Sequence, residues 1–160
     1  MTQHQTKQPE IKKDSVIGGA INAVINGLIY WFSNNISGNI MITGDAISST
    51  EKTVMSGAVP LAVSLAFMLT SISYFTWKLP GKPPYFPLVF KMALKHSIFA
   101  FGLVVIFAVL FQRIAGSIYV SQLTASVITG IVAGVAGGIV SYLTNSELLN
   151  HAMRDVRKSE

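Results

Sequence analysis

Four long stretches of this 160-residue chain contain no aspartate, glutamate, lysine or arginine. Among the features of the sequence, these charge-free stretches restrict the possible folds most strongly. They lie between Asp14 and Asp45, between Lys52 and Lys78, between Lys95 and Arg113, and between Arg113 and Glu147. Each can hold the roughly 20 apolar residues that a helix needs to cross a hydrocarbon layer about 30 Å thick. We therefore predict a single all-α domain, an integral membrane four-helix bundle with transmembrane helices over residues 15–33, 54–77, 94–112 and 121–143.

The composition agrees with a membrane protein. Hydrophobic residues make up 51% of the chain, charged residues only 12%, and the mean hydropathy is +0.52. Soluble domains carry about 25% charged residues, because a small globule has a large surface that must face water. The low charge content therefore argues against a soluble domain.

Basic residues alternate from one side of the predicted membrane to the other. Ten of the twelve lysines and arginines precede the first helix, lie between the second and third, or follow the fourth. Only Lys52 and Arg113 fall in the other two connections. This is the positive-inside pattern, so we expect a multi-pass protein of the bacterial inner membrane with both termini cytoplasmic. The net charge of +5 thus comes mainly from basic residues expected at the cytoplasmic surface of the lipid bilayer. We therefore expect the bilayer, and no nucleic acid, as a partner.

Polar segments flank the four helices. Residues 1–13 are rich in polar side chains and predict a disordered cytoplasmic tail. Residues 144–160 place Leu149, Met153 and Val156 on one helical face and basic residues on the other, which predicts an amphipathic cytoplasmic tail, either near the lipid headgroups or fraying in solvent. The connection over 79–87 holds four of the six prolines, so we expect a stiff spacer.

Short matches between the two halves of the chain favour an internal duplication. They pair KDSVI at 13–17 with KHSIF at 95–99, ISGNI at 36–40 with IAGSI at 114–118, and SYFT at 73–76 with SYLT at 141–144. The matches keep the same order, and each half would begin on the same side of the membrane. The bundle is therefore expected to consist of two parallel helix-hairpin repeats, unless the matches arose by chance.

The first predicted helix carries two amides that a purely lipid-facing helix would not need. Asn22 and Asn26 lie four residues apart and share a helical face with Gly19. An unpaired amide is costly in hydrocarbon, so this face must contact protein or water. Two interpretations stay open. The asparagines either fasten helices together, or they line a substrate path with Ser64 and Ser71 of the second helix.

Small residues recur along the fourth predicted helix. Those on the stripe are Ser126, Gly130, Gly134 and Gly138, with Gly137 beside them. Small side chains let helix backbones approach closely, which drives association in lipid. Together with Gly19 they predict a tight helix–helix contact, either within one chain or between two.

Residue types that carry catalysis or bind metals are scarce. The chain has no cysteine, and its three histidines lie in unrelated segments, so we expect no cofactor, no metal site and no enzymatic activity. His96 is the only ionisable side chain well placed near a predicted helix. We interpret it as a structural or interfacial residue rather than a proton-handling one.

Four segments give the chain a resemblance to known proteins. They are DSVIGGAINAVINGLIYW at 14–31, ISSTEKTVMSGAV at 47–59, KPPYFP at 82–87 and GIVAGVAGGIV at 130–140. In these the chain resembles a group of small bacterial four-helix membrane proteins loosely labelled permeases. The resemblance implies transport but assigns no functional residue.

Two functions follow as hypotheses. In the first, the chain is a small permease or channel-like protein that passes a small polar solute. Because four helices enclose little volume, we expect a homo-oligomer, a dimer or larger. In the second, it is a structural or accessory inner-membrane protein that packs on a partner complex through its proline-rich connection or its tails.

Overall fold

The computed structural model describes residues 3–34, 38–43, 52–76 and 83–159, with side chains in these ranges from residue 10 to residue 154. The described elements, in chain order, are α1 (Gln3–Ser33), β1 (Ile40–Met41), α2 (Val54–Thr76), the π-helical turn η1 (Tyr85–Val89), α3 (Phe90–Ala115), β2 (Tyr119–Val120) and α4 (Gln122–Ser159). Residues 77 and 79–82, which belong to the second predicted helix and the proline-rich connection, lie outside the described residues.

The predicted all-helical architecture with four apolar helices is confirmed. Within the described ranges, the segments long and apolar enough to cross a membrane are Glu10–Ser33, Val54–Thr76, Tyr85–Ala115 and Gln122–Arg154. Their outer surfaces carry large apolar side chains, and Val16, Phe32 and Ile98 are each more than 70% exposed. A surface of this kind is compatible with a multi-pass membrane protein, whose outer surface contacts lipid.

The helices α1, α3 and α4 are longer than the sequence predicts. The first begins at Gln3, so the segment expected to be a disordered tail is helical from residue 3 onward. The fourth continues through the predicted amphipathic tail to Ser159. Lysine, glutamate and glutamine are good helix formers, so a change from apolar to polar sequence ends the hydrophobic stretch without ending the helix.

The predicted amphipathic tail also packs differently from our expectation. Leu148 and Leu149 are 0% and 5% exposed, and Leu148 belongs to a buried apolar cluster with Tyr74, Val89 and Met92 of the neighbouring elements. This part of the tail is therefore buried against the bundle rather than laid on lipid headgroups.

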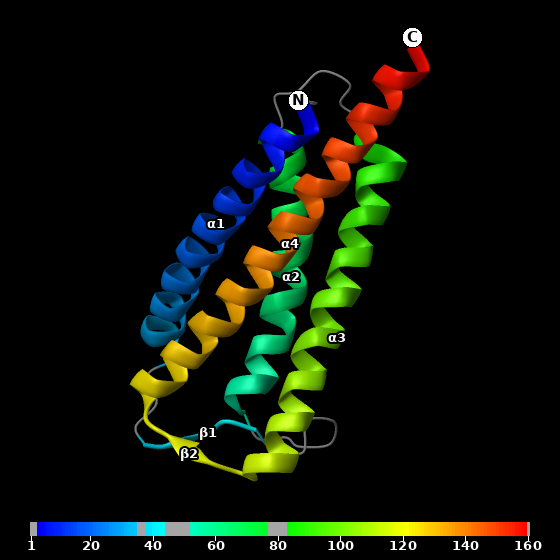
Figure 1. Ribbon diagram of the computed structural model, residues 1–160. Helices are drawn as coiled ribbons and strands as arrows, with labels where there is room; N and C mark the ends of the chain where they lie inside the picture. Colours follow the sequence, from blue (N-terminus) through cyan, green and yellow to red (C-terminus); the bar gives the residue numbers. More distant parts are fainter. Residues whose placement is uncertain (1–2, 35–37, 44–51, 77–82, 160) are drawn as a thin grey trace.

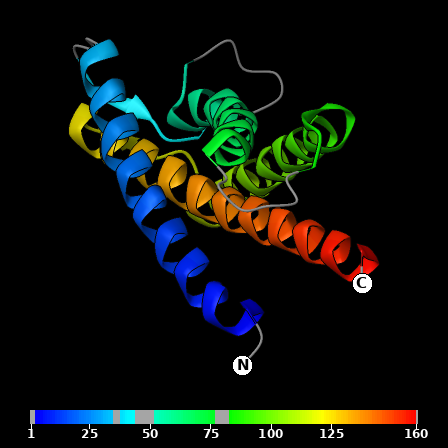
Figure 2. The same ribbon diagram turned by 90° about the horizontal axis from the view of Figure 1, so that it is seen from above.

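The helix order in space differs from the order along the chain. The central helices α2 and α4 pack on each other, while α1 packs on the outer side of α4 and α3 packs mainly on α2 (Figures 1 and 2). The two ends of the chain lie at one end of the bundle, and the strands lie at the other (Figure 1). Each helix of the first half thus has its main contacts with a helix of the second half.

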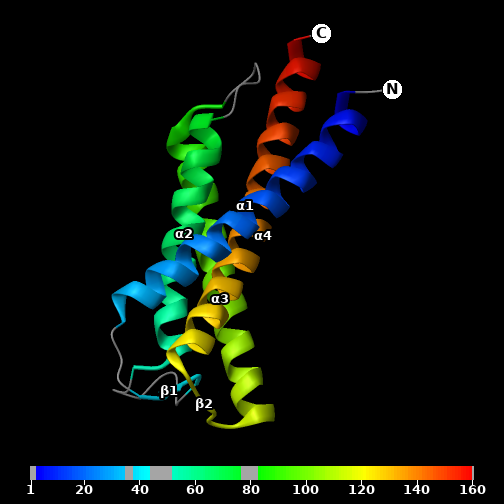
Figure 3. The same cartoon turned by 90° about the vertical axis from the view of Figure 1, so that its left-hand side faces the viewer.

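Small side chains bring the helices together on both sides of the centre. On the α2–α3 side, a stripe of alanines from α2 packs against small residues of α3; the set is Ala58, Ala62, Ala66, Ala100, Val104 and Ala108. On the α1–α4 side, Gly19 meets the backbone of Gly134 and Gly138, and Gly27 meets that of Ser126 and Gly130. The predicted small-residue contact therefore forms within one chain, as α1 crosses α4 (Figure 3).

A two-stranded antiparallel sheet joins the two halves at the end opposite the termini. Met41 pairs with Tyr119, and Ile40 with Val120. Next to the Met41–Tyr119 pair, the Ile42 amide donates to the Ile118 carbonyl at 2.9 Å. The paired residues Met41 and Tyr119 are 78 positions apart, and so are Gly38 and Gly116, which both have positive φ angles.

The starts of α2 and α4 are also alike. Thr53 and Ser56 exchange hydrogen bonds as a reciprocal N-terminal cap, each side-chain oxygen accepting from the other's amide at 3.0 Å. Sixty-eight positions later, the Ser121 hydroxyl accepts from the Thr124 amide at 3.3 Å. Ala58 and Ser126, which are also 68 positions apart, are both buried.

Candidate functional site

A polar cluster lies where α2, α3 and α4 meet. It consists of His96 from α3, Thr70 from α2 and Thr144 from α4, which are 1%, 0% and 0% exposed. The alanine stripe of α2 leads directly to Thr70, so close packing of small residues brings the three helices near enough for their side chains to touch. We call these three residues the histidine cluster.

One ring nitrogen of His96, Nδ1, lies within hydrogen-bond distance of two hydroxyl groups. His96 Nδ1 lies 3.0 Å from Thr70 Oγ1 and 3.1 Å from Thr144 Oγ1, and the two hydroxyl oxygens are 3.2 Å apart. Thr70 also donates to the Ala66 carbonyl at 2.8 Å. Because this contact uses the only hydroxyl hydrogen of Thr70, the Thr70 oxygen can only accept hydrogen bonds from His96 and Thr144.

The other ring nitrogen is buried without a hydrogen bond. Among the described residues, His96 Nε2 has no hydrogen-bond partner, and the nearest acidic oxygen is Glu147 Oε1 at 3.7 Å. Glu147 forms an ion pair with Lys95, and their side chains are 33% and 58% exposed. The ion pair therefore connects the buried imidazole to the surface at the end of the bundle that holds the termini.

Two serines extend the polar region. Ser97, the next residue of α3, donates to the Val63 carbonyl of α2 at 3.2 Å. Ser71 shares a 2.9 Å hydrogen bond with the Tyr85 hydroxyl of η1 and donates to the Phe67 carbonyl at 3.0 Å. Of the predicted path residues, Ser71 is thus the one that lies beside the histidine cluster in sequence.

The other predicted path residues satisfy themselves on their own helices. Asn22 donates to the Gly18 carbonyl at 3.0 Å, and Asn26 donates to the Asn22 carbonyl at 2.9 Å. Asn26 is buried, whereas Asn22 is half-buried and lies close to Gly137. Ser64 is exposed and donates to the carbonyl of Pro60. Each of the four residues proposed as a path from the sequence thus has a carbonyl partner on its own helix, and no hydrogen bond among the described residues joins α1 to Ser64 or Ser71.

The histidine cluster consists of groups that form hydrogen bonds. It offers an imidazole nitrogen, two hydroxyls and a nearby carboxylate, which can exchange hydrogen bonds with a small polar molecule. Within the described part of the chain, no group of three or more histidine, aspartate or glutamate side chains is placed to bind a metal ion.

Sequence reasoning found only part of this site. It singled out His96 but interpreted it as structural or interfacial, and it did not select Thr70 or Thr144. One signal in the sequence could have indicated this site. Lys95 precedes one charge-free stretch and Glu147 follows another, and both positions lie on the side predicted to be cytoplasmic. Oppositely charged residues at the same depth of two helices can pair, and this pair lies next to the imidazole.

Comparison with known proteins adds no assignment. No protein-family model matches this chain, and no curated protein or solved structure matches it.

Proposed function

We propose that the chain is a small membrane permease for a small polar solute, and that the solute is recognised at the histidine cluster. The observation that carries this proposal is the buried Nε2 of His96, which has no hydrogen-bond partner among the described residues. A buried polar group without a partner costs about 1–3 kcal/mol. Polar and ionisable residues between membrane helices commonly mark substrate or ion pathways.

The surroundings of the cluster support a route that opens at the terminal end of the bundle. Glu147 and Lys95 are partly exposed there, next to the imidazole. Toward the strands, the alanines of α2 and the small residues of α3 fill the space between the helices. In this arrangement passage requires α2 and α3 to separate, because closely packed apolar side chains leave no space for a polar solute.

Flux measurements test the permease. The purified chain is reconstituted into liposomes, and shrinkage and swelling with urea, glycerol and small amides are followed by light scattering. We expect at least one solute to enter faster than it enters protein-free liposomes. His96→Leu and Thr144→Val should slow this solute, while Thr76→Val, which alters an exposed hydroxyl on α2, should not. If no solute enters the protein-containing liposomes faster than the protein-free ones, the permease proposal is wrong.

The asparagines of α1 have their own test. Replacing Asn22 and Asn26 together by leucine should leave the flux unchanged if they only hold α1 in place, and should lower it if they line the route. Copurification of a stoichiometric partner, lost on deletion of residues 79–87, would instead favour an accessory role.

We further propose that both termini face the cytoplasm and that the two hairpins are internal repeats in the bacterial inner membrane. The placement of the basic residues supports the orientation. The strand register, the positive-φ glycines and the matching caps support the repeat. Because the chain has no cysteine, Lys13→Cys, Asn150→Cys and Ser117→Cys each create a unique label site. An impermeant maleimide added to intact cells should label only the Ser117→Cys variant.

A further inference from the structure

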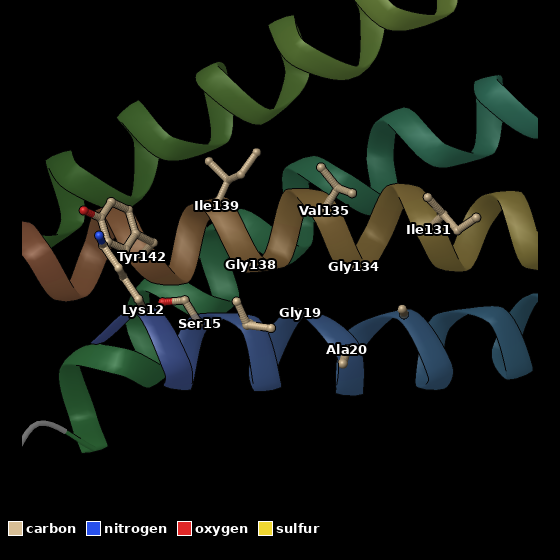
Figure 4. A pocket seen from close by; sticks show the side chains of 12 residues that line it. Lys12, Ser15, Gly19, Ala20, Ile131, Gly134, Val135, Gly138, Ile139 and Tyr142 are labelled. Carbon is tan, nitrogen blue, oxygen red and sulfur yellow. The ribbon is translucent and has the colours of Figure 1, made fainter. Parts of the chain in front are cut away.

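An apolar groove runs along the outside of the α1–α4 contact (Figure 4). It has a volume of about 700 Å³ and extends from Lys12 to Ala23 on α1 and from Ile131 to Tyr142 on α4. A second groove of about 520 Å³ shares Ala23 and Ile131 with it and continues toward the strands. Exposed side chains such as Val16 and Val135 form its walls, so the groove opens on the surface that would contact lipid.

The floor of this α1–α4 groove is backbone. Gly19, Gly134 and Gly138 all line it, and they are the residues at which the two helices touch. Because these positions have no side chains, the two backbones approach closely and backbone atoms line the groove between them. Its lining is almost entirely apolar, which suits a hydrocarbon chain.

The residues at the end of the groove nearest the termini carry polar groups. Lys12, Ser15 and Tyr142 line it, and Figure 4 shows the Lys12 side chain extending toward the Tyr142 ring, with Ser15 beside it. Ser15 is 4% exposed, and its hydroxyl has no hydrogen-bond partner among the described residues. Lys12 forms no ion pair with a residue whose side chain the structure describes. The Lys12 side chain and the Tyr142 ring thus lie at one end of an apolar groove, next to a buried serine hydroxyl without a hydrogen-bond partner among the described residues.

We propose that the α1–α4 groove binds one anionic phospholipid of the leaflet on the terminal side. Its phosphate group lies against Lys12 and Tyr142, above the buried Ser15, and one acyl chain lies along the glycine floor. The lengths agree, because the eleven steps from Lys12 to Ala23 rise about 16 Å at 1.5 Å per residue. Half of a hydrocarbon core about 30 Å thick is about 15 Å. The proposal does not depend on the permease route, which lies on the other side of α4 from α1.

Native mass spectrometry with matched variants tests the proposal. The detergent-purified chain is titrated with phosphatidylglycerol or with phosphatidylcholine of the same acyl chains. We expect one phosphatidylglycerol to be retained in preference to phosphatidylcholine. Lys12→Gln combined with Ser15→Ala should weaken its binding at least about fivefold, since one basic residue contributes about this factor near an anionic headgroup. Lys13→Gln removes the same charge from an exposed neighbour outside the groove and should have little effect.

A second pair of variants tests the acyl-chain site without altering charge. Ala20 is exposed and lines the groove, so the indole ring of Ala20→Trp should fill the groove and abolish tight binding of the phospholipid. Ile21, the next residue, is 53% exposed and does not line the groove, so Ile21→Trp should retain the lipid. Circular dichroism and gel filtration confirm that each variant keeps its helices and its size.

Three results would overturn the proposal. Equal retention of both lipids would exclude recognition of the headgroup. Equal weakening by Lys13→Gln would assign the binding to diffuse surface charge. A dimer that holds no lipid and dissociates in Ala20→Trp would show that a second copy of the chain occupies the groove. Loss of solute flux is not a readout here, so failure of the lipid proposal is distinguishable from failure of the permease proposal.

Discussion

Two adjacent glycines of α1 offer a direct test of the α1–α4 contact. A methyl group at Gly19 would lie 2.8 Å from the Gly134 carbonyl oxygen and 3.2 Å from the Gly138 Cα. A methyl group at Gly18 would meet no atom within 4 Å outside its own helix and chain neighbours. The substitutions Gly18→Ala and Gly19→Ala therefore differ in packing but share the same chemical change.

The expected magnitude follows from the distances. Ordinary contact begins at 3.4 Å, so Gly19→Ala requires a backbone shift of about 0.6 Å at the crossing. Overpacking of this kind costs about 1–3 kcal/mol. Both substitutions gain up to about 1 kcal/mol from the higher helix propensity of alanine. We therefore expect Gly18→Ala to be neutral or stabilising, and Gly19→Ala to be less stable than Gly18→Ala by about 1–3 kcal/mol.

Reversible unfolding in mixed micelles of mild detergent and dodecyl sulfate measures this difference. Gly130→Ala gives an independent check, because its methyl group would lie 2.6 Å from the Ala23 carbonyl oxygen. It should destabilise at least as much as Gly19→Ala. Equal free energies of unfolding for Gly18→Ala and Gly19→Ala would refute the close α1–α4 contact.

Two further predictions concern hydrogen bonds. Thr144→Val keeps the shape of the side chain but removes the hydroxyl at His96 Nδ1, so we expect a loss of about 1–3 kcal/mol in the free energy of unfolding. The exposed Thr76→Val should change it by less than about 0.5 kcal/mol, and equal losses would contradict the buried cluster. Thr53→Ala removes the reciprocal cap with Ser56 and should cost about 1 kcal/mol. A thermal shift assay in detergent would show this loss, and an unchanged midpoint would contradict the cap.

Much of the architecture follows from the amino-acid sequence alone. The charge-free stretches predict four apolar helices because hydrocarbon excludes unpaired charge, and this depends on local composition alone. The stripe from Ser126 to Gly138 predicts a close helix contact because small residues at a spacing of four share one face. Helix ends were less predictable, since the lysine-rich and glutamate-containing flanks of α1 and α4 continue the helices beyond their apolar parts.

Tertiary structure decided which helices are neighbours and which polar groups meet. Nothing local distinguishes α4 from α2 as the partner of α1, because a stripe of small residues occurs on both. Thr70, His96 and Thr144 belong to no motif in the sequence, being 26 and 48 positions apart. They become a site only because three helices converge there, and that convergence depends on the packing of the whole bundle. Hydropathy is a property of each segment, whereas the choice of partners is a property of the surfaces that segments present to one another.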